Sequence, residues 1–331
     1  MEAERSTCQR EHFMAFRFQA DQTVIENLKR IAREEIEAAL AEIADPELDT
    51  ATIVHQVRKR TKKVRGLLRL VRSGMQELAQ NENAIFRDAA AQLSSARDTD
   101  VALATLDALK TKLRKRLSKD SYAQLRKAVK RHQPQTAGQG GEAPIDARLE
   151  AFAEVMRLAQ QRIADWTFAE TIDPKQATGH ADLAIGGMTA SYRKARRRMK
   201  QSKLATCDES QSAEEQANAF HDWRKAVKDH GYHLRLLRDA LPDQLKQSGK
   251  LTAQLGELLG DDHDLTILSQ IIRKIPRETI SAADADAALS VLQRQSQKLR
   301  EQALELGSEL FADRPRDFRE QMTDAWDNWQ S

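Results

Sequence analysis

Residues 53–72 of the 331-residue chain, IVHQVRKRTKKVRGLLRLVR, contain eight lysines and arginines and no acidic residue. At about 100° per residue, one side of a helix formed here is apolar and consists of Val57, Val64, Leu68 and Val71. The opposite side is cationic and consists of His55, Arg58, Lys59, Lys62, Arg65 and Arg69. The stretch therefore predicts an amphipathic helix with one face in a core and a basic row on the other face.

The same pattern occurs again 166 residues later, in FHDWRKAVKDHGYHLRLLRD at residues 220–239. Eight positions are identical at this offset: His55 and His221, Arg58 and Arg224, Lys59 and Lys225, Lys62 and Lys228, Leu68 and Leu234, Arg69 and Arg235, Leu70 and Leu236, and Arg72 and Arg238. The apolar side of the second copy consists of Trp223, Val227, Leu234 and Leu237. Matches at one offset indicate an internal repeat. We therefore expect a tandem duplication of two helical units joined near residue 140.

The composition favours an all-α protein. Hydrophobic residues make up 40% and charged residues 31% of the chain, whereas the aromatic share is 5%. This apolar share, together with a net charge of +3, excludes a disordered chain. Good helix formers are abundant and no segment alternates as a strand does, which excludes an all-β fold.

The sequence shows no anchoring or export signal. No stretch approaches 18 consecutive apolar residues, and the first residues are too charged for the core of a signal peptide. Cys8 and Cys207 are far apart and form no metal-binding spacing. We therefore expect a cytoplasmic protein that does not enter a membrane.

Glycine and proline cluster at two places along the chain. Residues 133–146, QPQTAGQGGEAPID, predict a linker, and residues 173–187 predict a second loose stretch. We expect five parts: an N-terminal segment 1–20, a first helical repeat 21–132, the linker 133–146, a second helical repeat 147–310 and a C-terminal segment 311–331.

The two basic rows favour anion binding. A run of charge is most simply a solvated helix face, but such a face usually mixes both signs and gains pairs one turn apart. These rows contain almost no acid, and cations one turn apart, at about 5.4 Å, suit regularly spaced phosphates. Residues 192–203 form a third basic segment, for which a solvated face is the alternative. Its cations on one helical face are Arg193, Arg196, Arg197 and Lys200.

The histidines and the acidic clusters leave alternatives open. Each row histidine could donate to a phosphate oxygen, orient an arginine or serve only the fold. Asp98 and Asp100, and the Asp and His residues at 261–264, could suggest a metal site. Consecutive side chains point in different directions on a helix, however. We expect these clusters to cap a helix N-terminus or to pair with the basic rows.

These motifs resemble the CHAD family, the conserved histidine α-helical domain. The family pattern His-x-x-Arg-(Lys/Arg)-x-x-(Lys/Arg) heads a basic helix in each of two repeats. Here it reads HQVRKRTK at residues 55–62 and HDWRKAVK at residues 221–228. Leu-Arg-Leu follows each motif, and the segments ARDTDV, LGDDHDL and YRKARR also resemble family signatures. The resemblance covers roughly residues 20–310.

The resemblance implies two antiparallel helical bundles related by a pseudo-twofold axis, with basic helices around a central groove or pore. It also implies binding of inorganic polyphosphate, and possible targeting to polyphosphate granules, by a stand-alone member without a fused CYTH-type domain. Asp229 and Gly231 replace Lys63 and Arg65 in the second copy, which thins its row. The implied polyphosphate-binding residues are His55, Arg58, Lys59, Lys62, Arg65, Arg69, Arg72, Arg193, Arg196, Arg197, Lys200, His221, Arg224, Lys225, Lys228, Arg235 and Arg238.

Two other functions compete with non-catalytic polyphosphate binding. His221 and Asp222 could belong to an HD-type metal-dependent phosphohydrolase, but the surrounding cations oppose a divalent metal, and Gln56 replaces the aspartate in the first copy. Nucleic-acid binding suits the basic faces, but the rows have few aromatic residues and no known nucleic-acid motif occurs. We therefore expect no enzyme, no catalytic residue, no metal or cofactor and no nucleic-acid partner. Protein partners stay open.

Overall fold

The computed structural model describes residues 16–93, 97–132, 143–168, 179–208, 210–241 and 243–330. Within these ranges all regular structure is helical and no strand occurs, which confirms the all-α prediction. No described helix combines the length and apolarity needed to cross a membrane. The elements are α2 (Val24–Ala44), α3 (Thr50–Leu70), η1 (Arg72–Gly74), α4 (Gln76–Ala91), α5 (Arg97–Ala108), α6 (Lys110–Leu113), α7 (Lys119–Arg131), α8 (Ile145–Ile163), α9 (Gly179–Cys207), α10 (Ala213–Leu236), η2 (Arg238–Ala240), α11 (Asp243–Lys274), α12 (Ala282–Leu310) and α13 (Pro315–Gln330).

Polar caps start the two basic helices. α3 follows Asp49, whose carboxylate accepts a hydrogen bond of 3.0 Å from the backbone N–H of Thr52. α10 follows Ser212, which forms a capping box with Glu215. Side chains that satisfy the first backbone donors of a helix contribute about 0.5–2 kcal/mol each. Each cap thus starts a helix that carries its histidine in its N-terminal half.

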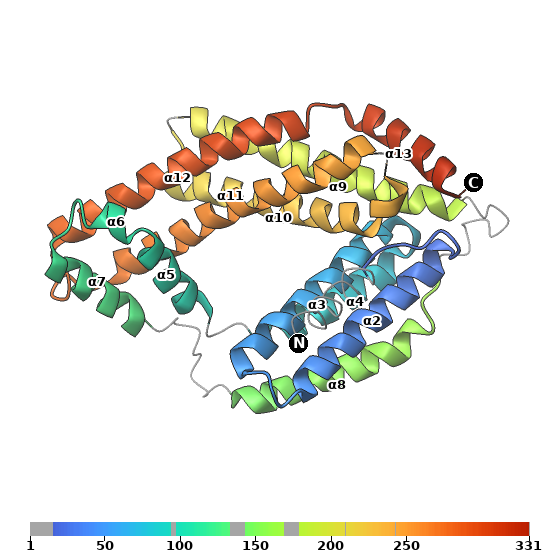
Figure 1. The fold of residues 1–331 in the computed structure, drawn as a ribbon, viewed down its shortest axis with the longest axis horizontal. Helices are drawn as coiled ribbons and strands as arrows, with labels where there is room; N and C mark the ends of the chain where they lie inside the picture. Colours follow the sequence, from blue (N-terminus) through green and yellow to red (C-terminus); the bar gives the residue numbers. More distant parts are fainter. Residues whose placement is uncertain are drawn as a thin grey trace, which may run out of the picture.

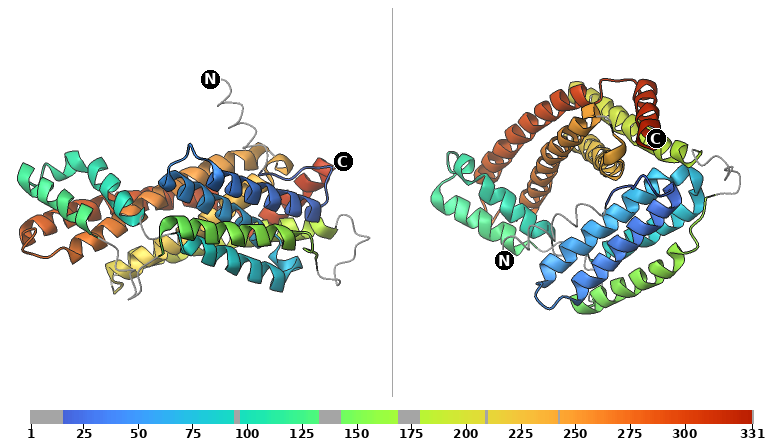
Figure 2. Two further views of the ribbon diagram at one scale, coloured as in Figure 1. Left: turned by 90° about the horizontal axis from the view of Figure 1, so that it is seen from below. Right: turned by 45° about the vertical axis from the view of Figure 1, so that its right-hand side comes forward.

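The helices pack in two groups (Figure 1). α2, α3, α4 and α8 pack together as one bundle, and α9 to α13 form the second group. α5, α6 and α7 pack against α11 and α12, and Figure 2 shows them apart from the first bundle. The first bundle and the second group meet where α3 and α2 contact α9 and α10.

The packing does not follow the chain order around the expected linker. α8 follows the linker but packs against α2 and α4, whereas α5 and α7 precede it and pack against α11. Each of the two hydrophobic clusters therefore contains residues from both halves of the chain. Residues 133–142 lie outside the described residues, and Ile145 and Asp146 already form the first turn of α8. The expected boundaries remain a prediction about the repeat.

Helix ends recur at the offset seen in the sequence. α3 ends at Leu70 and α10 at Leu236, and one 3₁₀ turn follows each of them. α5 ends at Ala108 and α11 ends at Lys274, again 166 residues later. α11 thus takes, as one long helix, the place of α4 and α5 together. This correspondence supports the interpretation of the chain as an internal repeat.

The expected loose stretch at 173–187 is wrong in its later part. α9 begins at Gly179 and includes Gly187, while residues 169–178 lie outside the described residues. A Cβ atom at Gly187 would lie 1.7 Å from the carbonyl oxygen of Leu70. The absence of a side chain therefore lets α9 cross the end of α3 in close contact.

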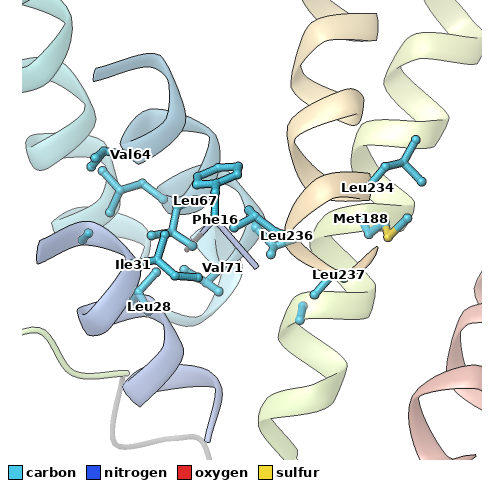
Figure 3. Packing of buried hydrophobic residues seen from close by; sticks show 14 of the residues in the cluster. Phe16, Leu28, Ile31, Val64, Leu67, Val71, Met188, Leu234, Leu236 and Leu237 are labelled. Atoms are coloured by element: carbon cyan, nitrogen blue, oxygen red, sulfur yellow. The ribbon is translucent and has the colours of Figure 1, made fainter. Parts of the chain in front are cut away.

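The apolar stripes predicted for both basic helices are buried, as expected. Each of the eight residues is at most 3% exposed: Val57, Val64, Leu68, Val71, Trp223, Val227, Leu234 and Leu237. Figure 3 shows Phe16 and Leu236 between the side chains of α2 and α3 and those of α9 and α10. The backbone N–H of Phe18 also donates to the carbonyl of Leu236 at 2.8 Å. The segment before α2 thus connects the first bundle to α10.

Candidate functional site

α3 and α10 lie against each other at their C-terminal ends. His233 Nε2 donates a hydrogen bond of 3.1 Å to the carbonyl oxygen of Gly66. A Cβ atom at Gly66 would lie 3.0 Å from the Cβ of Tyr232, so the close approach depends on the glycine. The N-terminal halves of the two helices, which contain His55 and His221, run apart from this contact (Figure 1). The two basic helices therefore converge at one end.

The first row runs along α3, and α4 holds two of its arginines. Arg58 is half-buried and donates from Nη1 to the carbonyl of Ala90 at 2.6 Å. Arg65 is also half-buried and donates from Nε to Asn83 Oδ1 at 3.1 Å. The exposed members of this row are His55, Lys59 and Lys62. α4 thus positions Arg58 and Arg65, while the exposed members of the row face solvent.

The second row is backed by α11. The ring of His221 stacks on that of His263 in α11, with the ring centroids 4.2 Å apart. Arg224 is half-buried beside Gly260, where a Cβ atom would lie 3.8 Å from its Nε. The exposed members of this row are Lys225, Lys228 and Arg235. His263 is therefore a new member of the site, which sequence reasoning considered only as part of an acidic cluster.

Burial and crowded positive charge disfavour the protonated form of both imidazoles. Burial, and after it the positive groups of α10, lower the pKa of His263 to about 4. Burial also lowers the pKa of His221, with further contributions from Lys225 and Arg224. A nearby negative charge would raise both pKa values again because it favours the protonated form. The α10–α11 cluster, defined as His221, Arg224, Lys225, Lys228 and His263, is thus arranged to gain from an anion.

Two polar atoms of the α10–α11 cluster have no hydrogen-bond partner among the described residues. His221 Nδ1 and Arg224 Nε are buried, and neither has a hydrogen-bond partner within the described part of the chain. A buried polar group left without a partner costs about 1–3 kcal/mol. Burial also lowers the pKa of Arg224, and Asp264 opposes this shift.

Two further cations of α3 face away from the row and pair with acids of α2. Glu35 is 2% exposed and accepts hydrogen bonds from Lys63 at 2.6 Å and from Arg60 at 3.1 Å. Arg60 also bonds Glu42 at 2.8 Å. These ion pairs fasten α3 to α2. Lys63 and Arg60 therefore serve the fold, and the acidic partners come from the N-terminal part of the chain.

The contact between α9 and α10 has acids on α10 and cations on α9. Asp222 of α10 pairs with Arg198 of α9, and Asp229 of α10 pairs with Lys194 of α9, each at 3.3 Å. Asp229 also pairs with Arg69 of α3. The aspartate that thins the second row is thus a junction between α3, α9 and α10.

The basic face predicted on α9 points in part toward α12. Arg196 Nε donates to the carbonyl of Phe311 at 2.9 Å. The other three members of that face, Arg193, Arg197 and Lys200, are exposed. The α9 cations beside α10 are Lys194 and Arg198, which the expected face did not include. Helical spacing shows which cations share a face but not which neighbour that face meets.

Three of the implied polyphosphate-binding residues, Arg72, Arg235 and Arg238, lie outside the α10–α11 cluster. The Arg235 guanidinium lies over the Tyr232 ring, 5.7 Å from its centroid. Arg72 and Arg238 are exposed in the 3₁₀ turns η1 and η2. These residues add positive charge near the contact between α3 and α10.

The expectation that residues 261–264 cap a helix is wrong, because they lie in the middle of α11. Asp262 is 2% exposed and accepts a hydrogen bond of 3.0 Å from Arg300 and another from Ser296, both on α12. It therefore fastens α11 to α12.

Residues 98–100 fall in the first turn of α5, and the side chains of Asp98 and Asp100 lie outside the described ones. Within the described ranges, no group of three or more His, Cys, Asp or Glu side chains is placed to hold a metal ion.

The site offers positive charge and N–H donors along two helices. Guanidinium and ammonium groups with these properties recognise phosphate groups through charge-assisted hydrogen bonds. The carboxylate of Asp222, next to His221, already forms ion pairs with Lys225 at 3.0 Å and with Arg198. The arrangement therefore suits binding of an anion better than activation of a nucleophile.

The family resemblance of the motifs extends to most of the chain. The CHAD domain profile matches residues 30–273. Among solved structures, the CHAD domain from the plant Ricinus communis is similar, with a TM-score of 0.49, 17% sequence identity and coverage of 90% of this chain and 94% of that chain. Among functionally curated proteins, no sequence matches this chain. Because the profile match spans well over half of the sequence, the protein belongs to the CHAD domain family.

Proposed function

We propose that this protein binds inorganic polyphosphate and does not hydrolyse it. The α10–α11 cluster carries the proposal, because His221, Arg224 and His263 meet there beside exposed lysines. Burial and, after it, the positive groups of the cluster lower the pKa of His263, and a polyanion would relieve the repulsion among these groups. Some members of the CHAD family bind polyphosphate, which agrees with this chemistry.

The two rows favour a chain of phosphates over a single phosphate. Cations recur along α3 and α10 at intervals of about one helical turn, or 5.4 Å. A phosphate chain can contact several turns at once, and each further contact within one bound chain is intramolecular. The contact between Gly66 and His233 brings the two helices together. Affinity should therefore rise with chain length until both rows are occupied.

Calorimetric titration with polyphosphate of defined length tests the proposal. Replacing two row cations, as Arg224→Gln with Lys228→Gln, should weaken binding at least about tenfold because two charge-assisted contacts are lost. The matched control is Arg33→Gln with Arg316→Gln, which removes two exposed cations from α2 and α13. The proposal fails if the wild-type protein does not bind, or if the row variant binds as tightly as the control.

Phosphate release distinguishes binding from HD-type hydrolysis. The wild-type protein is incubated with polyphosphate and with nucleotides in the presence of Mg²⁺ or Mn²⁺. The proposal predicts no release above that of heat-denatured protein. Release that depends on the metal and disappears in Asp222→Asn would support the hydrolase instead.

Competition distinguishes polyphosphate from nucleic acid. Long polyphosphate should displace labelled single- and double-stranded DNA at equal phosphate concentration, because the rows offer cations but few stacking surfaces. Displacement in the other direction would favour nucleic acid as the ligand.

We also propose a cytoplasmic location on polyphosphate granules. A fluorescent fusion of the wild-type protein should coincide with the granules, and the row variant should spread through the cell. Coincidence of both proteins with granules would show that the rows do not direct this location.

A further inference from the structure

A cationic cavity that is open to solvent lies between α6 and α12, outside the two basic rows. Its volume is about 260 Å³. Four of its six lining residues are cations and none is acidic. The lining residues are Lys112, Lys115, Arg116, Val291, Arg294 and Gln295. Figure 1 places α6 at the opposite end of the molecule from α13. The cavity is therefore separate from the contact between α3 and α10.

The backbone that carries three of these cations is held by buried leucines. After α6 the chain continues in tight turns, in which the N–H of Arg116 donates to the carbonyl of Leu113 at 2.9 Å. Leu113 is fully buried and Leu117 is 4% exposed, and both pack in the cluster formed with α11 and α12. On the opposite wall, Val291 is 6% exposed. The cations thus project from two packed walls.

Among the residues that the structure describes, the positive charge of the cavity has no acidic counterpart. Within the described part of the chain, Lys115, Arg116 and Arg294 form no ion pair, and Lys112 donates to an uncharged group, Gln295 Oε1. Asp107 of α5 is bound elsewhere, by Arg126 at 2.8 Å and by Tyr122 at 2.9 Å. Like charges gathered in a concave site attract anions.

We propose that this cavity is a second phosphate-binding site and that it takes a short run of a polyphosphate chain. Arginine and lysine together recognise phosphate oxygens by charge-assisted hydrogen bonds. The phosphate chemistry follows from the cavity itself, whereas the assignment to polyphosphate rests on the proposed function. With separate sites at the cavity and at the basic rows, one protein molecule binds two segments of polyphosphate and bridges neighbouring chains.

Titration calorimetry with tripolyphosphate tests the second site. The cavity variant is Lys115→Gln with Arg294→Gln, and both side chains are exposed, so the fold should be retained. The control is again Arg33→Gln with Arg316→Gln, and circular dichroism checks each variant. We expect the cavity variant to bind one tripolyphosphate molecule fewer than the wild-type chain. We expect Arg224→Gln with Lys228→Gln to lose a different site and to keep the cavity site.

The outcomes separate this site from the basic rows. If the cavity variant loses one site and the row variant loses none, the cavity inference stands and the proposed function of the rows fails. If the cavity variant matches the control, the inference is overturned. Orthophosphate that competes as well as tripolyphosphate at equal concentration would overturn the assignment to a chain.

Light scattering tests whether the protein bridges neighbouring polyphosphate chains. Light scattering of wild-type protein mixed with long polyphosphate should rise well above that of the cavity variant at equal occupancy. Equal scattering of the two proteins would contradict bridging through this cavity.

Discussion

His221 of α10 and His263 of α11 stack on each other, with ring centroids 4.2 Å apart and ring planes 26° apart. Burial is the largest cause of the lowered pKa of each ring, and the cations of α10 lower both further. Among the acids, Asp222 acts on His221 and Asp264 acts on Arg224, and both oppose the lowering of the pKa. A polyanion added to this pair would favour protonation. We therefore expect the stacked pair to couple anion binding to pH.

Polyphosphate binding should take up protons near pH 6. The pKa of His263 is about 4 in the free protein, and negative charge beside it would move this value toward its ordinary range near 6.5. Calorimetry at pH 6 in two buffers of different ionisation enthalpy measures the uptake. Binding should also tighten as the pH falls from 8 to 6. Heats that are equal in the two buffers would contradict the coupling, and His263→Gln should reduce any difference.

The free protein should lose stability as the pH falls from about 6.5 toward 4. Burial lowers the pKa of His233 to about 4 and is the main cause of the same value at His263. The folded pKa values lie below the ordinary value, so the unfolded chain takes up protons in this range that the folded chain does not. Thermal unfolding measured at several pH values should show Tm decreasing toward pH 4. A Tm that is constant from pH 6.5 to 4.5 would contradict the neutral state of these rings.

Asp229→Asn should separate stability from affinity. The carboxylate pairs with Arg69 of α3 and lies 3.3 Å from Lys194 of α9, so its loss should cost about 1–3 kcal/mol in the free energy of unfolding. Polyphosphate affinity should rise at the same time, because a negative charge beside the row is removed. Urea unfolding and calorimetry measure the two effects. Unchanged stability with weaker binding would contradict the junction role of Asp229.

Gly187→Ala and Gly186→Ala form a matched test of the contact between α9 and α3. A Cβ atom at Gly187 would overlap the Leu70 carbonyl at 1.7 Å, so the substitution should cost about 1–3 kcal/mol or more. A Cβ atom at Gly186 would meet no described atom within 4 Å. That substitution should stabilise the helix by about 0.5–1 kcal/mol. Equal effects at the two positions, measured by urea unfolding, would contradict the close packing.

The sequence predicted the all-α fold and the buried face of each basic helix because both follow from local periodicity. Val57 and Trp223 were placed correctly by their spacing alone. Long-range packing was not predictable in this way. The glycines at 186 and 187 indicated a loop, yet both lie within α9. At Gly187 the absence of a side chain permits the backbones of α9 and α3 to approach, whereas nothing lies within 4 Å of a Cβ atom at position 186.

The candidate site was predictable only in part, for the same reason. The row on α10 was visible as one charged face, but its stacking partner His263 comes from α11 and shares no local pattern with His221. Lys63 belonged to a basic run in the sequence, yet it pairs with Glu35 from a different helix. Pairings between helices depend on the packing of the whole fold, which helical spacing does not report.

The salt dependence of polyphosphate affinity tests most directly whether both rows hold the ligand. Each cation that contacts a phosphate releases counterions, so the logarithm of the association constant falls linearly with the logarithm of salt concentration. We predict that Lys59→Gln with Lys62→Gln, and separately Arg224→Gln with Lys228→Gln, each lower the steepness of this line by about two, roughly one for each cation removed. A line as steep as that of the wild-type protein in either variant would show that its row does not contact the chain.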